Sequence, residues 1–250
     1  MSYRAPPILR PFANTLAVCF LLMQAMYHPQ AFAADNSKPV LDALLRFLDA
    51  LDAADAPALK QLIYVPDKPP ALQLCRDAFI DLVVAQKRLE RAAQTRFPTQ
   101  ANRFRRDLDL IATPADRKSI AEASVMIDDS QEARLTLPGE TSPIRMSLST
   151  SGQWQVMLDV VEPDTLLEAR TLQVNPDALL QLRIDRLRAM SEAVSLAASG
   201  IEGATSPDPS AAETSLADRI AALEADYRNK LDQLRNRPRM PRPHDVYEPD

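Results

Sequence analysis

The pattern of apolar and polar residues has a helical period from about residue 40 to residue 97. From Val40 the apolar residues return every three or four positions, which indicates an amphipathic helix to about Ala54. Pro57 suits the first turn of a second short helix, because its fixed φ is already helical. After three prolines a long helix is expected to end near Phe97, and its apolar positions are Leu72, Cys75, Phe79, Leu82, Val83, Leu89 and Ala93.

The apolar period shortens to two between residues 125 and 160, which predicts β-strands. Turn residues at 128–130, 138–139 and 151–152 separate four alternating runs, and turns this short join neighbouring strands as hairpins. We therefore predict an α+β fold in which N-terminal helices pack on a curved antiparallel four-stranded meander, followed by C-terminal helices. Trp154, on the last strand, is expected to fill the core.

The final third of the chain returns to a helical period. Residues 161–199 are predicted as a helical extension of an α+β domain that spans residues 38–160. The composition of residues 200–215 predicts a flexible linker, and residues 237–250 form a Pro/Arg-rich tail. Between these segments, residues 216–236 are predicted as an amphipathic helix with apolar positions at Leu216, Ile220, Leu223, Tyr227, Leu231 and Leu234.

This terminal helix needs a partner, because an isolated helix of about 20 residues is marginal in water. Its first apolar steps follow the alternating four-three spacing of a coiled coil. The helix therefore either docks on the rest of the chain, binds another protein, or associates weakly with a second copy through residues 216–234.

The N-terminal 33 residues have the composition of a secretory signal peptide. Arg4 and Arg10 precede an uncharged apolar run at 12–26, and Ala31 and Ala33 supply small residues at a cleavage site. The run is short of the roughly 20 residues that span a membrane. We therefore predict cleavage after Ala33 and export to the periplasm or the medium, with no membrane-spanning segment left.

Composition narrows the classes of function. The chain has 29 Lys and Arg against 34 Asp and Glu, and its net charge of −5 becomes −7 without the two arginines of residues 1–33. Such a charge gives no general attraction to nucleic acid or anionic membranes. The same cleavage leaves one cysteine, Cys75, and one histidine, His244, which excludes an intramolecular disulfide, His-cluster metal sites and Ser-His-Asp triads. The four glycines form no phosphate-binding loop, so no metal or cofactor is expected.

Two features of the sequence resemble the nuclear-transport-factor-two-like superfamily. An Asp-Ala-Ala-Asp-x-Pro-Ala-Leu turn occupies residues 52–59, and the predicted strands close on Gly152-x-Trp154-x-Val156. The resemblance covers about residues 40–160 and is to exported, uncharacterised members rather than to the enzymes of the family. It implies a curved antiparallel sheet that wraps around helices to form a cone. Enzymes of the family place Asp, Tyr or His in the cone, and no such catalytic motif maps onto this sequence.

Three residues are candidates for a pocket. Tyr64 lies between predicted helices, where its hydroxyl could enter a cavity, although packing beside a Pro-rich loop also explains it. Asp107 and Asp109 share one side of an extended segment, as paired carboxylates for acid–base chemistry would. Neighbouring arginines at 103, 105 and 106 favour a solvated ion-pair face instead.

Two further positions have simpler interpretations. Asp128 and Asp129 are explained by a hairpin turn without a bound cation. Cys75 precedes Arg76, which could activate a thiol, but it lies on the apolar stripe of its helix. It is predicted to be a buried, unreactive thiol.

Three hypotheses for function remain open. The first is an exported, non-enzymatic module that binds an unknown protein or small ligand. The second is an isomerase, cyclase or hydrolase of the cone fold that uses carboxylates or Tyr64. The third is a scaffold that acts through its C-terminal helix. An enclosed apolar pocket holding an unpaired carboxylate would favour the enzyme.

Overall fold

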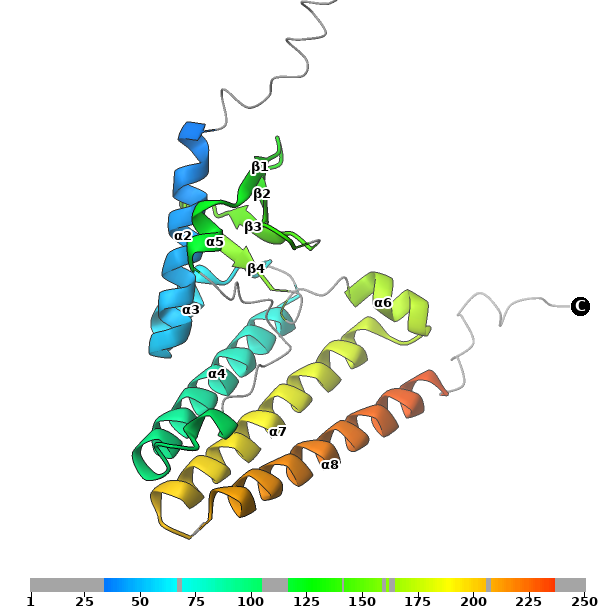
Figure 1. Ribbon diagram of the computed structural model, residues 1–250. Helices are drawn as coiled ribbons and strands as arrows, with labels where there is room; N and C mark the ends of the chain where they lie inside the picture. Colours follow the sequence, from blue (N-terminus) through cyan, green and yellow to red (C-terminus); the bar gives the residue numbers. More distant parts are fainter. Residues whose placement is uncertain are drawn as a thin grey trace, which may run out of the picture.

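The computed structural model describes residues 34–66, 69–104, 117–140, 142–158, 161, 165–205 and 208–236. Helices precede and follow a four-stranded antiparallel sheet, so the predicted α+β class is confirmed. Figure 1 shows the sheet beside the first helices and three long helices side by side below them.

Two helices form the N-terminal part of the described chain. α2 (Ala34–Ala53) begins before the predicted stripe and includes Pro39 near its start. After Ala54, with a φ of +54°, the Asp55 carboxylate accepts a hydrogen bond from the N–H of Ala58 and so caps α3 (Ala56–Leu62). The side of α2 that is buried in the core consists of Val40, Ala43, Leu44, Phe47, Leu48, Ala50 and Leu51.

The sheet is a meander in the order β1-β2-β3-β4. Its strands are β1 (Ser124–Ile127), β2 (Glu132–Thr136), β3 (Ile144–Leu148) and β4 (Trp154–Met157). Gly152, in the turn before β4, has a φ of +77°, a conformation that favours glycine. One face of the sheet is buried in the common core through Ala133, Leu135, Met146, Trp154 and Val156. The burial of Trp154 confirms its predicted place.

The segment after α3 covers the β4 edge of the sheet. Ile63 forms a parallel bridge with Val156, and the N–H of Tyr64 donates to the carbonyl of Val156 at 2.9 Å. The side-chain amide of Gln155 donates to the carbonyl of Gln61 at 2.7 Å. These bonds attach α3 to the sheet.

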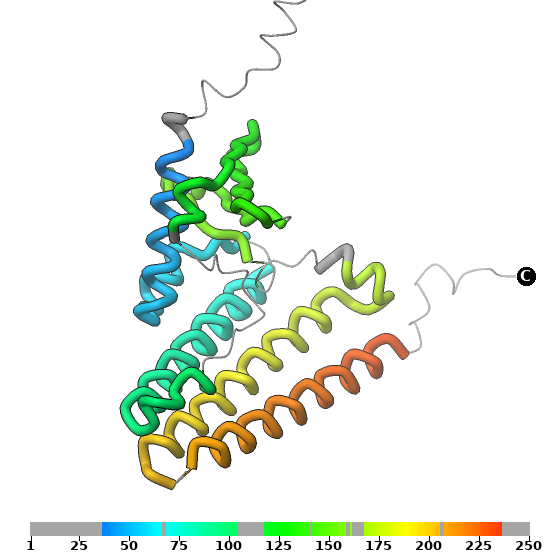
Figure 2. The backbone as a smooth tube through the Cα atoms, viewed as in Figure 1, coloured from blue at the N-terminus to red at the C-terminus, as the bar shows by residue number. Residues whose placement is uncertain are grey.

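Three long helices form a layer: α4 (Ala71–Arg96), α7 (Pro176–Glu202) and α8 (Pro209–Arg235). α4 and α7 run in the same direction and make the most extensive contact in the described chain, whereas α8 returns antiparallel to α7 (Figure 1 and Figure 2). Arg88 on α4 is paired with Glu202 at the end of α7. The shorter elements are η1 (Ala101–Phe104), α5 (Arg117–Ala121) and α6 (Thr165–Leu172).

Residues 161–199 do not extend from a separate domain at 38–160. Because α4 packs on α7, one continuous cluster of buried residues joins the two segments. Leu180, Ile184, Leu187 and Val194 of α7 belong to the same core as Phe79 of α4. The C-terminal helices therefore complete the core that the N-terminal half begins.

The prediction of a flexible linker at 200–215 is wrong for most of its length. α7 continues through Gly200 to Glu202, and α8 begins at Pro209 rather than at Leu216. The Asp208 carboxylate caps α8 by accepting from the N–H of Ala211, and proline is suited to the next position. Burial of Ile201 and Ala212 offsets the ordering entropy of these small residues, so the connection shrinks to residues 203–208.

The terminal helix docks on its own chain. The predicted apolar side of α8 faces α7, where Leu216 is buried and the remaining apolar positions are half-buried. Arg186 of α7 donates to the Glu224 carboxylate, and its guanidinium lies 4.8 Å from the ring centre of Tyr227. Self-association through residues 216–234 would have to compete with this contact.

Hydropathy does not mark any described helix as a membrane span. None of the helices in the described ranges is both long enough and apolar enough to cross a bilayer.

Candidate functional site

A shallow groove runs along α2 where this helix meets α3 and the turn between β3 and β4. It consists of two adjoining hollows with volumes of about 390 and 740 Å³. Arg46, Asp49 and Gln153 line both hollows, which makes them one continuous surface. The first hollow is completed by Ala50, Ala53, Asp55, Ala58, Gln61 and Leu62, and the second by Lys38, Pro39, Asp42, Leu45, Gly152 and Trp154.

The helical period of α2 produces the charged wall of this groove. Lys38, Asp42, Arg46 and Asp49 follow one another at steps of four, four and three, so they share one side of the helix. Positive and negative side chains alternate along that side. Arg46 Nε also lies 3.4 Å from the carbonyl of Asp42, to which it donates. The wall therefore offers hydrogen-bond donors and acceptors in alternation.

Small residues shape the floor, and a glycine turn positions the opposite wall. Ala50, Ala53 and Ala58 are too short to fill the space between α2 and α3. The turn at Gly152 brings Gln153 and Trp154 to the groove, although Trp154 is only 9% exposed and presents little of its surface there. The groove is open to solvent, and its lining combines apolar surface with charged and amide groups, so it suits a ligand that makes both apolar contacts and hydrogen bonds.

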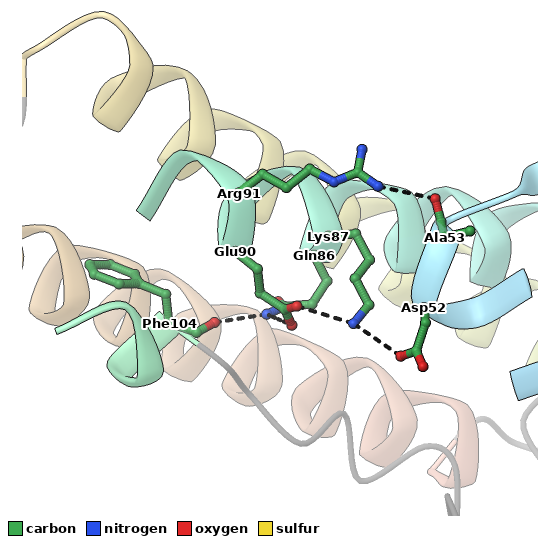
Figure 3. A network of polar contacts seen from close by, with 7 residues as sticks. All are labelled: Asp52, Ala53, Gln86, Lys87, Glu90, Arg91 and Phe104. Atoms are coloured by element: carbon green, nitrogen blue, oxygen red, sulfur yellow. Dashed lines mark hydrogen bonds and ion pairs between the residues drawn. The ribbon is translucent and has the colours of Figure 1, made fainter. Parts of the chain in front are cut away.

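A network of polar contacts holds the far end of α2 in place (Figure 3). Lys87 of α4 lies 3.1 Å from the Glu90 carboxylate and 3.7 Å from that of Asp52. Arg91 donates to the carbonyl of Ala53 at 3.1 Å, where a cation is favoured by the helix dipole. These contacts fix α2, and hence the charged wall, relative to α4.

Gln86 connects the same network to η1. Its side chain is buried, and its Nε2 donates to the carbonyl of Phe104 at 2.8 Å and to Glu90 at 3.3 Å (Figure 3). These two hydrogen bonds satisfy the Nε2 of Gln86 and favour the fold, whereas its Oε1 is buried with no hydrogen-bond partner among the described residues. We interpret the network as a structural support of the groove.

Of the three residues predicted from the sequence, only Tyr64 is among the described residues, and it lies outside this groove. Tyr64 is half-buried on the segment that covers the β4 edge, and it does not line either hollow. Asp107 and Asp109 lie outside the described residues. The groove residues were not identified from the sequence, although the alternating charges at 38, 42, 46 and 49 are a signal that could have found them.

Two other positions agree with their simpler interpretations. Asp128 lies in the turn between β1 and β2, where hydrogen bonds from the Ser130 hydroxyl and the Glu132 N–H hold the pKa of this carboxyl below its ordinary value. Arg76 donates to Asp77 and to the carbonyl of Lys60, away from the apolar stripe that contains Cys75. Neither position forms a site with its neighbours.

Cys75 is expected to be unreactive in the folded protein. Its side chain is fully buried, and burial raises the pKa of the thiol to about 11, opposed by the charge of Arg183. At pH 8 a disulfide reagent should therefore react roughly 100-fold more slowly in the native protein than in denaturant. In the protein that begins at Ala34, which lacks Cys19, Cys75→Ser is the control, because it should remove the reaction that appears on unfolding. Equal rates in the two states would contradict the burial of the thiol.

No group of three or more His, Cys, Asp or Glu side chains suited to a metal ion occurs among the described residues. Comparison with protein-family models, with curated proteins and with solved structures gives no match to this chain. The functional interpretation therefore depends on the groove itself.

Proposed function

We propose that this protein is an exported, non-enzymatic binding module and that its groove along α2 holds an extended segment of another polypeptide. The observation that carries the proposal is the continuity of the two hollows through Arg46, Asp49 and Gln153. A continuous, open groove accommodates a chain, whereas small ligands usually occupy more enclosed, largely apolar cavities.

The chemistry of the lining supports a peptide ligand. A polypeptide backbone carries donors and acceptors in alternation and needs both kinds of partner. Gln153 supplies an amide with both functions, while Arg46 and Asp49 supply one charge of each sign. Acidic and basic side chains of the ligand would then select its register along the groove.

The remaining predictions from the sequence belong to the same proposal. Export follows from the signal peptide at residues 1–33, and an intact mass of the exported protein that begins at Ala34 would support it. The order of helices followed by a meander closing on Gly152-x-Trp154-x-Val156 is in keeping with a nuclear-transport-factor-two-like fold. An isomerase, cyclase or hydrolase of the cone fold that uses carboxylates or Tyr64 stays the alternative, and a scaffold acting through α8 is the second.

A displayed library of random peptides provides the test. Peptides selected on the purified protein should bind Arg46→Glu at least tenfold more weakly, because a charge in the middle of the groove is reversed. Arg188→Glu is the matched control, since Arg188 is an exposed arginine on α7 that lines neither hollow. Selected peptides that bind both variants equally well, or a library that yields no binder, would contradict the proposal.

A further inference from the structure

β1 leaves one edge of the sheet open. Within the described residues its only neighbouring strand is β2, whereas the opposite edge is covered by Ile63 and Tyr64. Figure 1 shows β1 on the side of the sheet away from α4, α7 and α8. An uncovered edge presents unpaired backbone groups that can bind another strand.

The hydrogen-bond register shows which backbone groups face that edge. The N–H of Asp128 donates to the carbonyl of Glu132, which marks these two residues as a hydrogen-bonded pair. Such pairs alternate along an antiparallel ladder, so Met126 and Ser124 also direct their backbone groups to β2. The N–H and C=O groups of Val125 and Ile127 therefore point outward.

The side chains of β1 are unusually apolar for an edge. Met126 is 71% exposed and Ile127 is 40% exposed, which are two of the five large exposed apolar residues in the described chain. Lysine and proline are among the features that keep edge strands from pairing, and β1, which is four residues long, contains neither. Both the outward backbone groups of β1 and its exposed apolar side chains therefore favour pairing with another strand.

We propose that β1 pairs antiparallel with β1 of a second copy of this chain, about a two-fold axis at Met126. In this register Val125 lies opposite Ile127 of the second copy, and the outward N–H and C=O groups of the two residues exchange hydrogen bonds. The two-fold axis repeats this pair, so it occurs twice in the dimer. The two Met126 side chains lie next to each other on one face, and Val125 and Ile127 pack together on the other. Two four-stranded sheets become one sheet of eight strands.

Hydrogen bonding and polarity select this register and a second copy as the partner. An axis at Val125 would place Ile127 opposite Ala123 of the other copy, whose N–H already donates to the carbonyl of Ile120. An axis at Ile127 would place the Asp128 carboxylate opposite the apolar Met126. With the axis at Met126, Asp128 lies opposite Ser124, whose hydroxyl is a suitable donor. The strand is thus complementary to itself.

The experiment changes Met126, which lies opposite Met126 of the second copy at the two-fold axis. Met126→Lys and Met126→Glu each place two like charges side by side at the axis, so each variant alone should dimerise roughly tenfold more weakly at low ionic strength. An equimolar mixture of the two places Lys against Glu and should restore the dimer. Sedimentation velocity of the purified protein over a range of concentrations measures both effects.

Leu74→Lys is the matched control, because Leu74 is an exposed leucine on α4, far from β1 in the sequence, and its replacement should leave the dimer unchanged. Circular dichroism of each variant confirms that it is folded, as expected for a side chain as exposed as Met126. A wild-type protein that stays monomeric at high concentration overturns the proposal. So does a dimer that is insensitive to Met126→Lys, or two weakened variants that mixing does not restore.

Discussion

Replacing Phe79 with alanine is expected to lower the free energy of unfolding by about 3–5 kcal/mol. Phe79 is on α4, its side chain is fully buried, and it is among the largest side chains in the core. Its loss removes both the transfer free energy of the ring and the packing of the atoms around it. Denaturant unfolding followed by circular dichroism measures the change.

Leu74→Ala is the matched control on the same helix. Leu74 is 47% exposed, so its truncation should change stability by about 0.5 kcal/mol or less. If Phe79→Ala lowered the free energy of unfolding no more than Leu74→Ala, the side of α4 that carries Phe79 would not be buried in the core.

Trp154→Ala is expected to cost about 3–5 kcal/mol as well. Trp154 begins β4 and lies opposite Leu148 of β3, and it belongs to the core cluster while a small part of it reaches the groove. β4 contacts α2, and Trp154 is the largest side chain that this strand contributes to the core. The same unfolding measurement tests it.

Thr136→Ala in β2 is the control for this sheet, because Thr136 is exposed and its truncation should have an effect of about 0.5 kcal/mol. If Trp154→Ala cost less than about 1 kcal/mol, the indole would be contributing to a binding surface rather than to the core.

Local patterns were enough to predict the order of elements. The change from a helical period to a period of two marked the four strands, and residues such as Gly139 and Gly152 marked the turns between them. These signals are readable because each strand pairs with its neighbour in sequence. The stripe on α4 was equally clear, since most of its apolar positions are buried.

Features that depend on distant contacts were not predicted. The end of α7 is rich in small residues, and its helix persists because Ala198 and Ile201 are buried in the common core. The groove along α2 also escaped prediction, because Arg46 and Gln153 are brought together only by the packing of α2 on β4. Composition alone describes neither arrangement.

The parallel packing of α4 on α7 has a consequence for the order of folding. The ion pair between Arg88 and Glu202 joins residues that are 114 positions apart, and the loop between them contains the whole sheet. A contact of such long range forms slowly, because the loop entropy is lost before the contact is gained. During synthesis the apolar stripe of α4 therefore stays exposed until α7 has been made. In that interval a chaperone or a second nascent chain can bind the stripe more readily than at any later stage.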